Sequence, residues 1–223
     1  MGNYPILFLV FVILGTVGVF AYLGMRADKK RTDGLRQTAE EMGFEFTPAP
    51  DAGMLGRYPG FHLFSQGNGR TVENLLRGRA GGLDVSVFDY SYSTGGGKSR
   101  HTWRQTVLAF EIDDVDLPTF SLRPETVFHK IGQWFGYQDI DFETHPRFSN
   151  SYLLRGANED AVRALFRDDV LEYYEDNAGV CTEGHGGRLV YFRSEHRTDP
   201  TQVRPFLEEG FRVLALFRPP KEG

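Results

Sequence analysis

The sequence predicts an α+β fold, in which an N-terminal transmembrane helix precedes a cytoplasmic domain with an antiparallel β-sheet and helices packed against it. Three observations lead to this prediction. The stretch Pro5–Met25 carries no charge, and residues 73–112 alternate apolar and polar side chains between short turns. Apolar residues then recur at helical spacing in several later segments. Strands joined by tight turns pair antiparallel, and amphipathic helices cover them.

The first predicted element is a transmembrane anchor in residues 1–25. A helix over the uncharged stretch Pro5–Met25 would be about 31 Å long, which matches the hydrocarbon core of a bilayer. A cleaved signal peptide is the alternative, but the chain has no basic residue before its apolar run, and the run is longer than in such peptides. We therefore expect a retained anchor that contacts the lipid bilayer through residues 5–25.

Charges after the anchor predict its orientation. No Lys or Arg precedes the apolar run, and five follow it closely: Arg26, Lys29, Lys30, Arg31 and Arg36. Basic residues stay on the cytoplasmic side of a membrane. The chain is thus expected to cross once, with the N-terminus outside and the C-terminal domain in the cytoplasm.

The next predicted element is a juxtamembrane helix over residues 26–43, continuous with the anchor. Leu35, Ala39 and Met42 follow helical spacing, and Gly43 is placed to end the helix. Residues 44–223 then form the α+β domain. Its length leaves open one unit or two subdomains, at about 44–136 and 137–223.

Strands dominate the first half of this domain. A short strand is expected at 44–46, and longer ones at 73–79, 83–93 and 103–112, with Gly81 and Gly82 forming a hairpin turn. The apolar residues occupy odd-numbered positions up to Val87 and even-numbered positions from Phe88 onward. This change indicates either a bulge or a strand buried on both faces.

The second half mixes strands and helices. We expect an edge strand at 118–123, a helix at 124–135, and strands at 139–143 and 152–155. Asn158 is placed to cap a helix, a second helix covers 168–176, and a hairpin surrounds residues 184–187. Asp199 and Pro200 open a last helix that reaches Phe217.

Composition excludes several classes of protein. The 223 residues include 25 Lys and Arg against 30 Asp and Glu, and this acidic balance argues against a nucleic-acid partner. Cys181 is the single cysteine, which excludes an intramolecular disulfide and fits a reducing compartment. No complete catalytic motif and no cofactor-binding motif is present, so we predict no cofactor.

The glycine-rich tip of the 83–112 hairpin is the first candidate site. Aromatic and basic residues surround it, a combination common at interfaces. We predict that a protein or lipid-headgroup partner binds Tyr90, Tyr92, Lys98, Arg100, His101 and Trp103. The alternative is that the aromatic residues are core and the loop is only solvated.

A row of carboxylates is the second candidate. On a strand, Asp139, Asp141 and Glu143 would point the same way, and three aligned carboxylates suit a hard cation. A solvated strand face is the simpler interpretation.

Two groups of segments resemble a bacterial family. The first joins Val72–Gly78, Val87–Tyr92, Leu117-Pro118 and Arg123–Glu125, and the second runs from Phe148 to Phe166. Together they resemble bacterial membrane proteins that carry a domain of unknown function behind one or two membrane helices. The resemblance implies a bacterial inner (plasma) membrane and implies no activity.

The sequence therefore predicts a non-enzymatic binding or scaffold domain anchored at the cytoplasmic face of a bacterial inner membrane. The alternative is a metal-assisted hydrolase or transferase that uses the carboxylate row. Small residues recur every three positions in the anchor, at 15, 18, 21 and 24, and leave open a homodimer.

Overall fold

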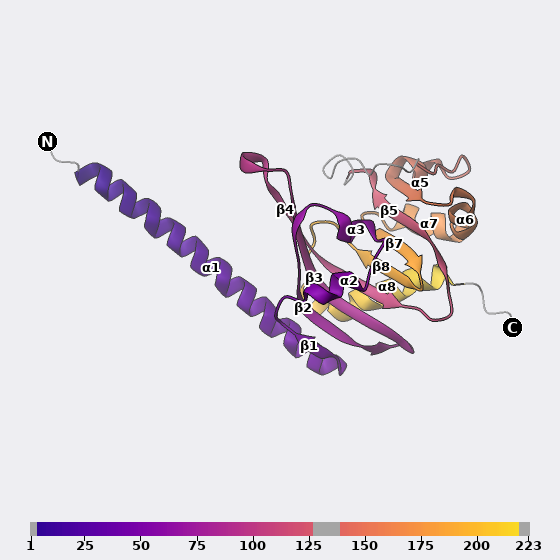
Figure 1. Ribbon diagram of the computed structural model, residues 1–223, viewed down its shortest axis with the longest axis horizontal. Coiled ribbons are helices and arrows are strands. Elements are labelled where there is room, and N and C mark those ends of the chain that lie inside the picture. Colours follow the sequence, from indigo (N-terminus) through magenta and orange to yellow (C-terminus); the bar gives the residue numbers. More distant parts are fainter. Residues whose placement is uncertain (1–3, 127–138, 219–223) are drawn as a thin grey trace.

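The computed structural model describes residues 4–126 and 139–218, and it has one long helix that leads into a compact α+β body (Figure 1). The helices are α1 (Tyr4–Met42), α2 (Ala52–Gly56), α3 (His62–Ser65), α5 (Pro146–Ser151), α6 (Glu159–Leu165), α7 (Asp168–Asp176) and α8 (Val203–Leu216). The strands are β1 (Glu45–Thr47), β2 (Asn68–Ala80), β3 (Leu83–Thr94), β4 (His101–Glu111), β5 (Leu117–Pro124), β6 (Tyr152–Gly156), β7 (Cys181–Gly186) and β8 (Arg188–Phe192). Two 3-10 turns, at Gly97–Ser99 and Pro200–Gln202, complete the described elements.

Helix α1 runs without a break from Tyr4 to Met42, so the predicted juxtamembrane helix is the C-terminal part of a longer one. Gly43 follows with φ +70°, the left-handed conformation that ends a helix. Within the residues that the structure describes, no helix contains a stretch long and apolar enough to cross a membrane. The structure thus gives no support for the span expected at residues 5–25, which stays a prediction.

All strands belong to one antiparallel sheet with the order β1-β2-β3-β4-β8-β7-β5-β6. Strand β5, from the first half of the chain, pairs with β6 and β7 from the second half. Strand β4 likewise pairs with β8. The sheet therefore crosses the boundary near residue 136, and the domain does not divide there into two sequential halves.

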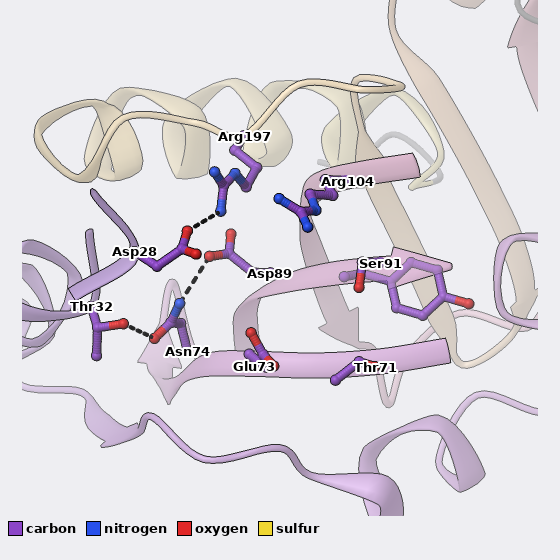
Figure 2. A pocket seen from close by; sticks show the side chains of 10 residues that line it. Asp28, Thr32, Thr71, Glu73, Asn74, Asp89, Ser91, Arg104 and Arg197 are labelled. Atoms are coloured by element: carbon purple, nitrogen blue, oxygen red, sulfur yellow. Dashed lines mark hydrogen bonds and ion pairs between the residues drawn. The ribbon is translucent and has the colours of Figure 1, made fainter. Parts of the chain in front are cut away.

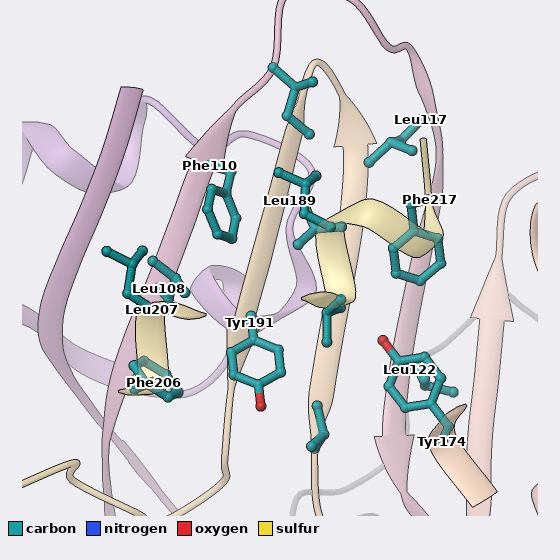
Figure 3. Close-up of a cluster of buried hydrophobic side chains, with 14 of the residues drawn as sticks. Leu108, Phe110, Leu117, Leu122, Tyr174, Leu189, Tyr191, Phe206, Leu207 and Phe217 are labelled. Atoms are coloured by element: carbon teal, nitrogen blue, oxygen red, sulfur yellow. The ribbon is translucent and has the colours of Figure 1, made fainter. Parts of the chain in front are cut away.

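Both faces of the sheet are covered. The C-terminal half of α1 and helices α5 to α8 pack on one face, where Tyr191 of β8 meets Phe206 (Figure 3) and Phe120 of β5 meets Phe217. The segment with α2 and α3 packs on the other face, around Phe64 and an aromatic row on β3 and β4. A sheet covered on both sides needs strands with apolar residues at consecutive positions.

Strand β3 shows this directly. Val85 and Val87 belong to one cluster, while Phe88, Tyr90 and Tyr92 belong to the other. Pairing of β3 with β4 is regular along its whole length. The strand buried on both faces is thus confirmed, and the alternative of a bulge in β3 is wrong.

The bulge lies instead in β2. Its register with β3 shifts between Asn68 and Thr71 and again between Glu73 and Leu76. Asn74, inside the second interval, has φ +51°, a conformation that asparagine tolerates better than most residues.

Two strand predictions in the second half are wrong. Strand β5 is an interior strand and not an edge, although it contains Pro118. Its register with β7 shifts between Leu117 and Phe120, and its pairing with β6 begins only at Phe120. The proline therefore lies where the ladder is interrupted, so its missing N–H breaks no pairing.

Residues 139–143 form no strand, because their backbone has no partner strand. Ile140 N–H donates a single hydrogen bond to the Leu154 carbonyl at 2.8 Å, and the segment then turns toward α5. The helix expected at 124–135 falls mostly outside the described residues. The last helix begins at Val203, after a 3-10 turn that Asp199 caps through the Thr201 N–H.

Candidate functional site

A buried ion pair joins α1 to the sheet. The Arg31 guanidinium donates to both carboxylate oxygens of Asp89 on β3, at 2.6 and 2.7 Å, and the two side chains are only 11% and 10% exposed. Asp89 also accepts hydrogen bonds from Asn74 Nδ2 at 3.0 Å and Thr106 Oγ1 at 3.1 Å. Arg31 donates further to the Thr198 carbonyl at 2.8 Å. Every charged atom of the pair is thus satisfied, which a buried pair requires.

A pocket of about 270 Å³ lies beside this ion pair, where α1 leaves the sheet (Figure 2). Its floor is the face of β2, β3 and β4 that carries Thr71, Glu73, Ser91 and Arg104. Asp28 of α1 and Arg197 of the loop before α8 form its wall and pair at 3.3 Å. The pocket is therefore polar, and α1 borders it directly.

The three aromatic residues of the predicted hairpin site are buried. Tyr90, Tyr92 and Trp103 are each 1% exposed, and Tyr92 stacks on Trp103 with 6.0 Å between the ring centroids. The Tyr90 hydroxyl donates to the Leu63 carbonyl at 3.3 Å. Burial raises the pKa of both tyrosines well above its usual value. The prediction that these aromatic rings form an exposed surface is wrong, because α3 covers that face of the sheet.

The three basic residues of the same prediction are exposed. Lys98 lies in the 3-10 turn at the hairpin tip, and Arg100 follows it and donates to Ser93 Oγ at 3.2 Å. His101 bonds to Glu195 and lies edge-on against the Trp103 ring at 4.7 Å. The structure thus separates the six residues into an interior aromatic group and an exposed basic group. Partner binding by the basic group stays a prediction.

The predicted carboxylate row does not converge. Asp139, Asp141 and Glu143 are all exposed in an irregular segment. Partial desolvation of its carboxylate, followed by the negative charge of Asp141, raises the pKa of Asp139. Within the part of the chain that the structure describes, no three His, Cys, Asp or Glu residues are grouped so as to hold a metal ion. The strand-borne metal site is therefore not formed.

Sequence reasoning missed a second buried ion pair, on the other face of the sheet. Arg123 of β5 donates to Glu183 of β7 at 2.6 Å, with side chains 7% and 1% exposed. Glu183 also accepts the Leu63 N–H at 3.1 Å, and Arg123 lies over the Phe192 ring at 5.8 Å. This pair holds α3 against the sheet. Its two charges are 60 positions apart in the chain, so no local pattern reveals them.

Gln66 joins this network from the end of α3. With its amide oxygen toward Arg123, Gln66 accepts hydrogen bonds at 2.6 and 2.7 Å and donates to the Tyr92 hydroxyl at 3.0 Å. Burial, followed by the positive charge of Arg123, lowers the pKa of the nearby His62 to about 4. Gln66, Arg123 and Tyr92 satisfy one another, which is the arrangement expected of structural groups in a core.

Fold and site together define an α+β domain in which a long N-terminal helix is joined by a buried ion pair to a two-faced antiparallel sheet. This fold is similar to the crystal structure of the mycobacterial trehalose monomycolate transport factor A, TtfA, with a TM-score of 0.59 and 15% sequence identity. The match covers 84% of this chain and 92% of TtfA, and at this identity it shows the fold alone. No family model and no curated protein matches the sequence.

Proposed function

We propose that this chain is a membrane-anchored, non-enzymatic binding or scaffold protein with a transport-related role at the cytoplasmic face of a bacterial inner membrane. One observation carries the proposal. Helix α1 begins in the uncharged segment 5–25 and ends inside the domain, where Leu35 and Ala39 are buried in the core and Arg31 pairs with Asp89. The same rigid element therefore belongs to both the anchor and the domain.

Exposed apolar side chains support the anchor. Figure 1 shows α1 extending far beyond the body of the domain. On this part of the helix Phe8 is 71% exposed and Phe20 74%, and Leu14, Leu23 and Met25 are exposed as well. Transfer of apolar side chains from water into lipid is favourable, by roughly 25 cal/mol per Å² of surface removed from water. The basic residues that follow favour a cytoplasmic domain.

The state of the chemically active groups supports binding over catalysis. Cys181 is fully buried, and burial raises the pKa of its thiol to about 12, so the thiolate is scarce at neutral pH. Glu183, which is also buried, is committed to Arg123 and the Leu63 N–H. TtfA, which has a similar fold, is a trehalose monomycolate transport factor. A transport-related role for this chain agrees with the role of TtfA, and the bacterial membrane family that the sequence resembles agrees with the membrane location.

Carbonate extraction and cysteine labelling test the proposal. We expect the full chain to stay in the membrane pellet after extraction at high pH. A single Lys98→Cys substitution should react with a membrane-impermeant maleimide only after the inner membrane is opened, and Asn3→Cys should react in intact spheroplasts. The native Cys181 is the internal control, because its buried thiol should not react. Release of the chain by carbonate, or labelling of Lys98→Cys in intact spheroplasts, would overturn the proposal.

A further inference from the structure

The pocket beside α1 contains two charges that the protein leaves unpaired. Asp89 is satisfied by Arg31, Asn74 and Thr106, and Asp28 pairs with Arg197. Glu73 and Arg104 also line the pocket, and both are exposed. Among the described residues, neither the Glu73 carboxylate nor the Arg104 guanidinium has a hydrogen-bond or ion-pair partner. One negative and one positive group are therefore available to a ligand.

Strand register fixes where these two charges stand. Thr71, Ser91 and Arg104 are cross-strand partners in one row, and Glu73 pairs with Asp89 in the next row on the same face. Two strand spacings separate Glu73 from Arg104, which is about 10 Å across the sheet. Ser91 lies on the intervening strand β3, and Thr71 lies on β2 in the same row as Arg104, so both hydroxyl groups are beside the two charges. No ion pair joins these two described side chains, and their positions on one face of the sheet suit a ligand that carries both signs of charge.

A second arginine strengthens the positive end of the pocket. Figure 2 shows the guanidinium groups of Arg104 and Arg197 on the same side of the cavity, reaching in from β4 and from the loop before α8. Arg197 keeps its 3.3 Å ion pair with Asp28, so Arg104 supplies the uncompensated positive charge and Arg197 contributes its remaining N–H donors. Guanidinium groups bind phosphate through paired N–H donors in a fixed geometry. The positive end therefore favours a phosphate.

We propose that this pocket binds a phosphate-plus-amine headgroup of the phosphoethanolamine type. Arg104 and Arg197 hold the phosphate, Thr71 and Ser91 donate hydroxyl hydrogen bonds, and Glu73 accepts the ammonium. The ligand comes from a membrane lipid because the pocket opens where α1 leaves the domain, and this choice of source rests on the proposed anchor. A free zwitterion with the same groups is the other source of this chemistry.

The first experiment measures soluble headgroups with the full chain in detergent micelles. Glycerophosphoethanolamine and glycerophosphoglycerol are titrated calorimetrically. We expect Arg104→Gln to weaken both at least tenfold, and Glu73→Gln to weaken only the amine-bearing compound by that factor. Arg79→Gln is the matched control, because Arg79 is exposed on β2 outside the pocket, and it should bind as the parent does. Equal affinities in the parent and in Arg104→Gln would overturn the site.

The second experiment distinguishes the two sources. The full chain is placed in nanodiscs of phosphatidylcholine with either phosphatidylethanolamine or phosphatidylglycerol, and its melting temperature is measured. A lipid ligand predicts a higher melting temperature with phosphatidylethanolamine, lost in Glu73→Gln. Binding of the soluble compound without this lipid effect supports the pocket and overturns the lipid source. A chain that carbonate releases from membranes, yet binds the soluble headgroup, overturns only the anchor.

Discussion

At the residue scale, the Arg31–Asp89 pair controls how α1 is attached, and this gives the first prediction. Asp89→Asn keeps the size of the side chain but leaves the Arg31 guanidinium buried without a counter-charge. Breaking one partner of a buried pair costs about 3 kcal/mol or more. We expect that loss in the free energy of unfolding, measured by urea titration in detergent with the tryptophan fluorescence to which buried Trp103 contributes.

Asp84→Asn is the control for this change. Asp84 lies on the same strand, is 64% exposed and pairs weakly with Arg79 at 3.7 Å. Exposed pairs contribute less than about 1 kcal/mol, so this variant should unfold nearly as the parent does. Equal losses for the two variants would show that the Arg31 pair does not stabilise the domain.

The second prediction concerns His62 and pH. Burial and the charge of Arg123 lower the pKa of His62 from 6.5 to about 4. Between these values the unfolded chain binds the proton and the folded chain does not, so the free energy of unfolding decreases as pH falls from 6.5 to 4. The contribution is at most about 1.4 kcal/mol per pH unit. His62→Gln should flatten this part of the stability–pH curve, and an unchanged slope would contradict the assignment.

At the element scale, the third prediction concerns the junction of α3 with β2. Gly67 has φ +56°, and a Cβ atom there would lie 2.3 Å from the backbone oxygen of Ser93. Alanine would therefore meet both left-handed strain and a backbone clash, and we expect Gly67→Ala to lower the free energy of unfolding by about 2 kcal/mol or more. Gly96→Ala, in open space at the hairpin tip, should change stability little. The free energies of unfolding of the two variants are measured by urea titration. Equal values would show that Gly67→Ala causes no clash.

Elements whose evidence is local were predicted well from the sequence. The Gly81–Gly82 turn needs φ values of +57° and +83°, which glycine supplies without strain, and Asn158 caps α6 by accepting the Ala161 N–H. The prediction of a strand at residues 139–143 is wrong. Alternation of apolar and polar side chains indicates that one side of a segment is buried, but it does not show that a partner strand exists. Strand β5 is an interior strand because it pairs with β7, which lies more than fifty positions later in the chain, so the local sequence does not reveal this position.

The expected exposure of the aromatic residues in the first candidate site is wrong for a related reason. Aromatic residues alternate along β3 in the same way whether that face of the sheet contacts water or α3. The sequence pattern therefore does not show that Tyr90 and Tyr92 are buried. The pocket residues Glu73, Arg104 and Arg197 come from three separate segments. The register of β2, β3 and β4 brings Glu73 and Arg104 together, and the loop before α8 adds Arg197; register is a property of the whole sheet.

At the scale of the whole molecule, α1 and the β3–β4 hairpin project from the same side of the domain (Figure 1). If residues 5–25 lie in a bilayer, the continuous helix sets the orientation of the sheet and brings Lys98 toward the headgroups. A fluorophore on Lys98→Cys is then quenched by headgroup-labelled lipid. Cys181 should not interfere, because burial raises the pKa of its thiol to about 12.

The fourth prediction breaks this continuity. Proline at position 27 removes a helical hydrogen bond and clashes with the preceding turn, so Ala27→Pro should bend α1 between the anchor and Arg31. We expect the quenching to fall by at least half while the urea midpoint of the domain is unchanged, since the contacts of α1 with the core begin after this position. Ala27→Leu keeps the helix and should keep the quenching. Quenching that survives Ala27→Pro would mean that contacts of the domain itself with lipid, and not the helix, determine how the domain faces the membrane.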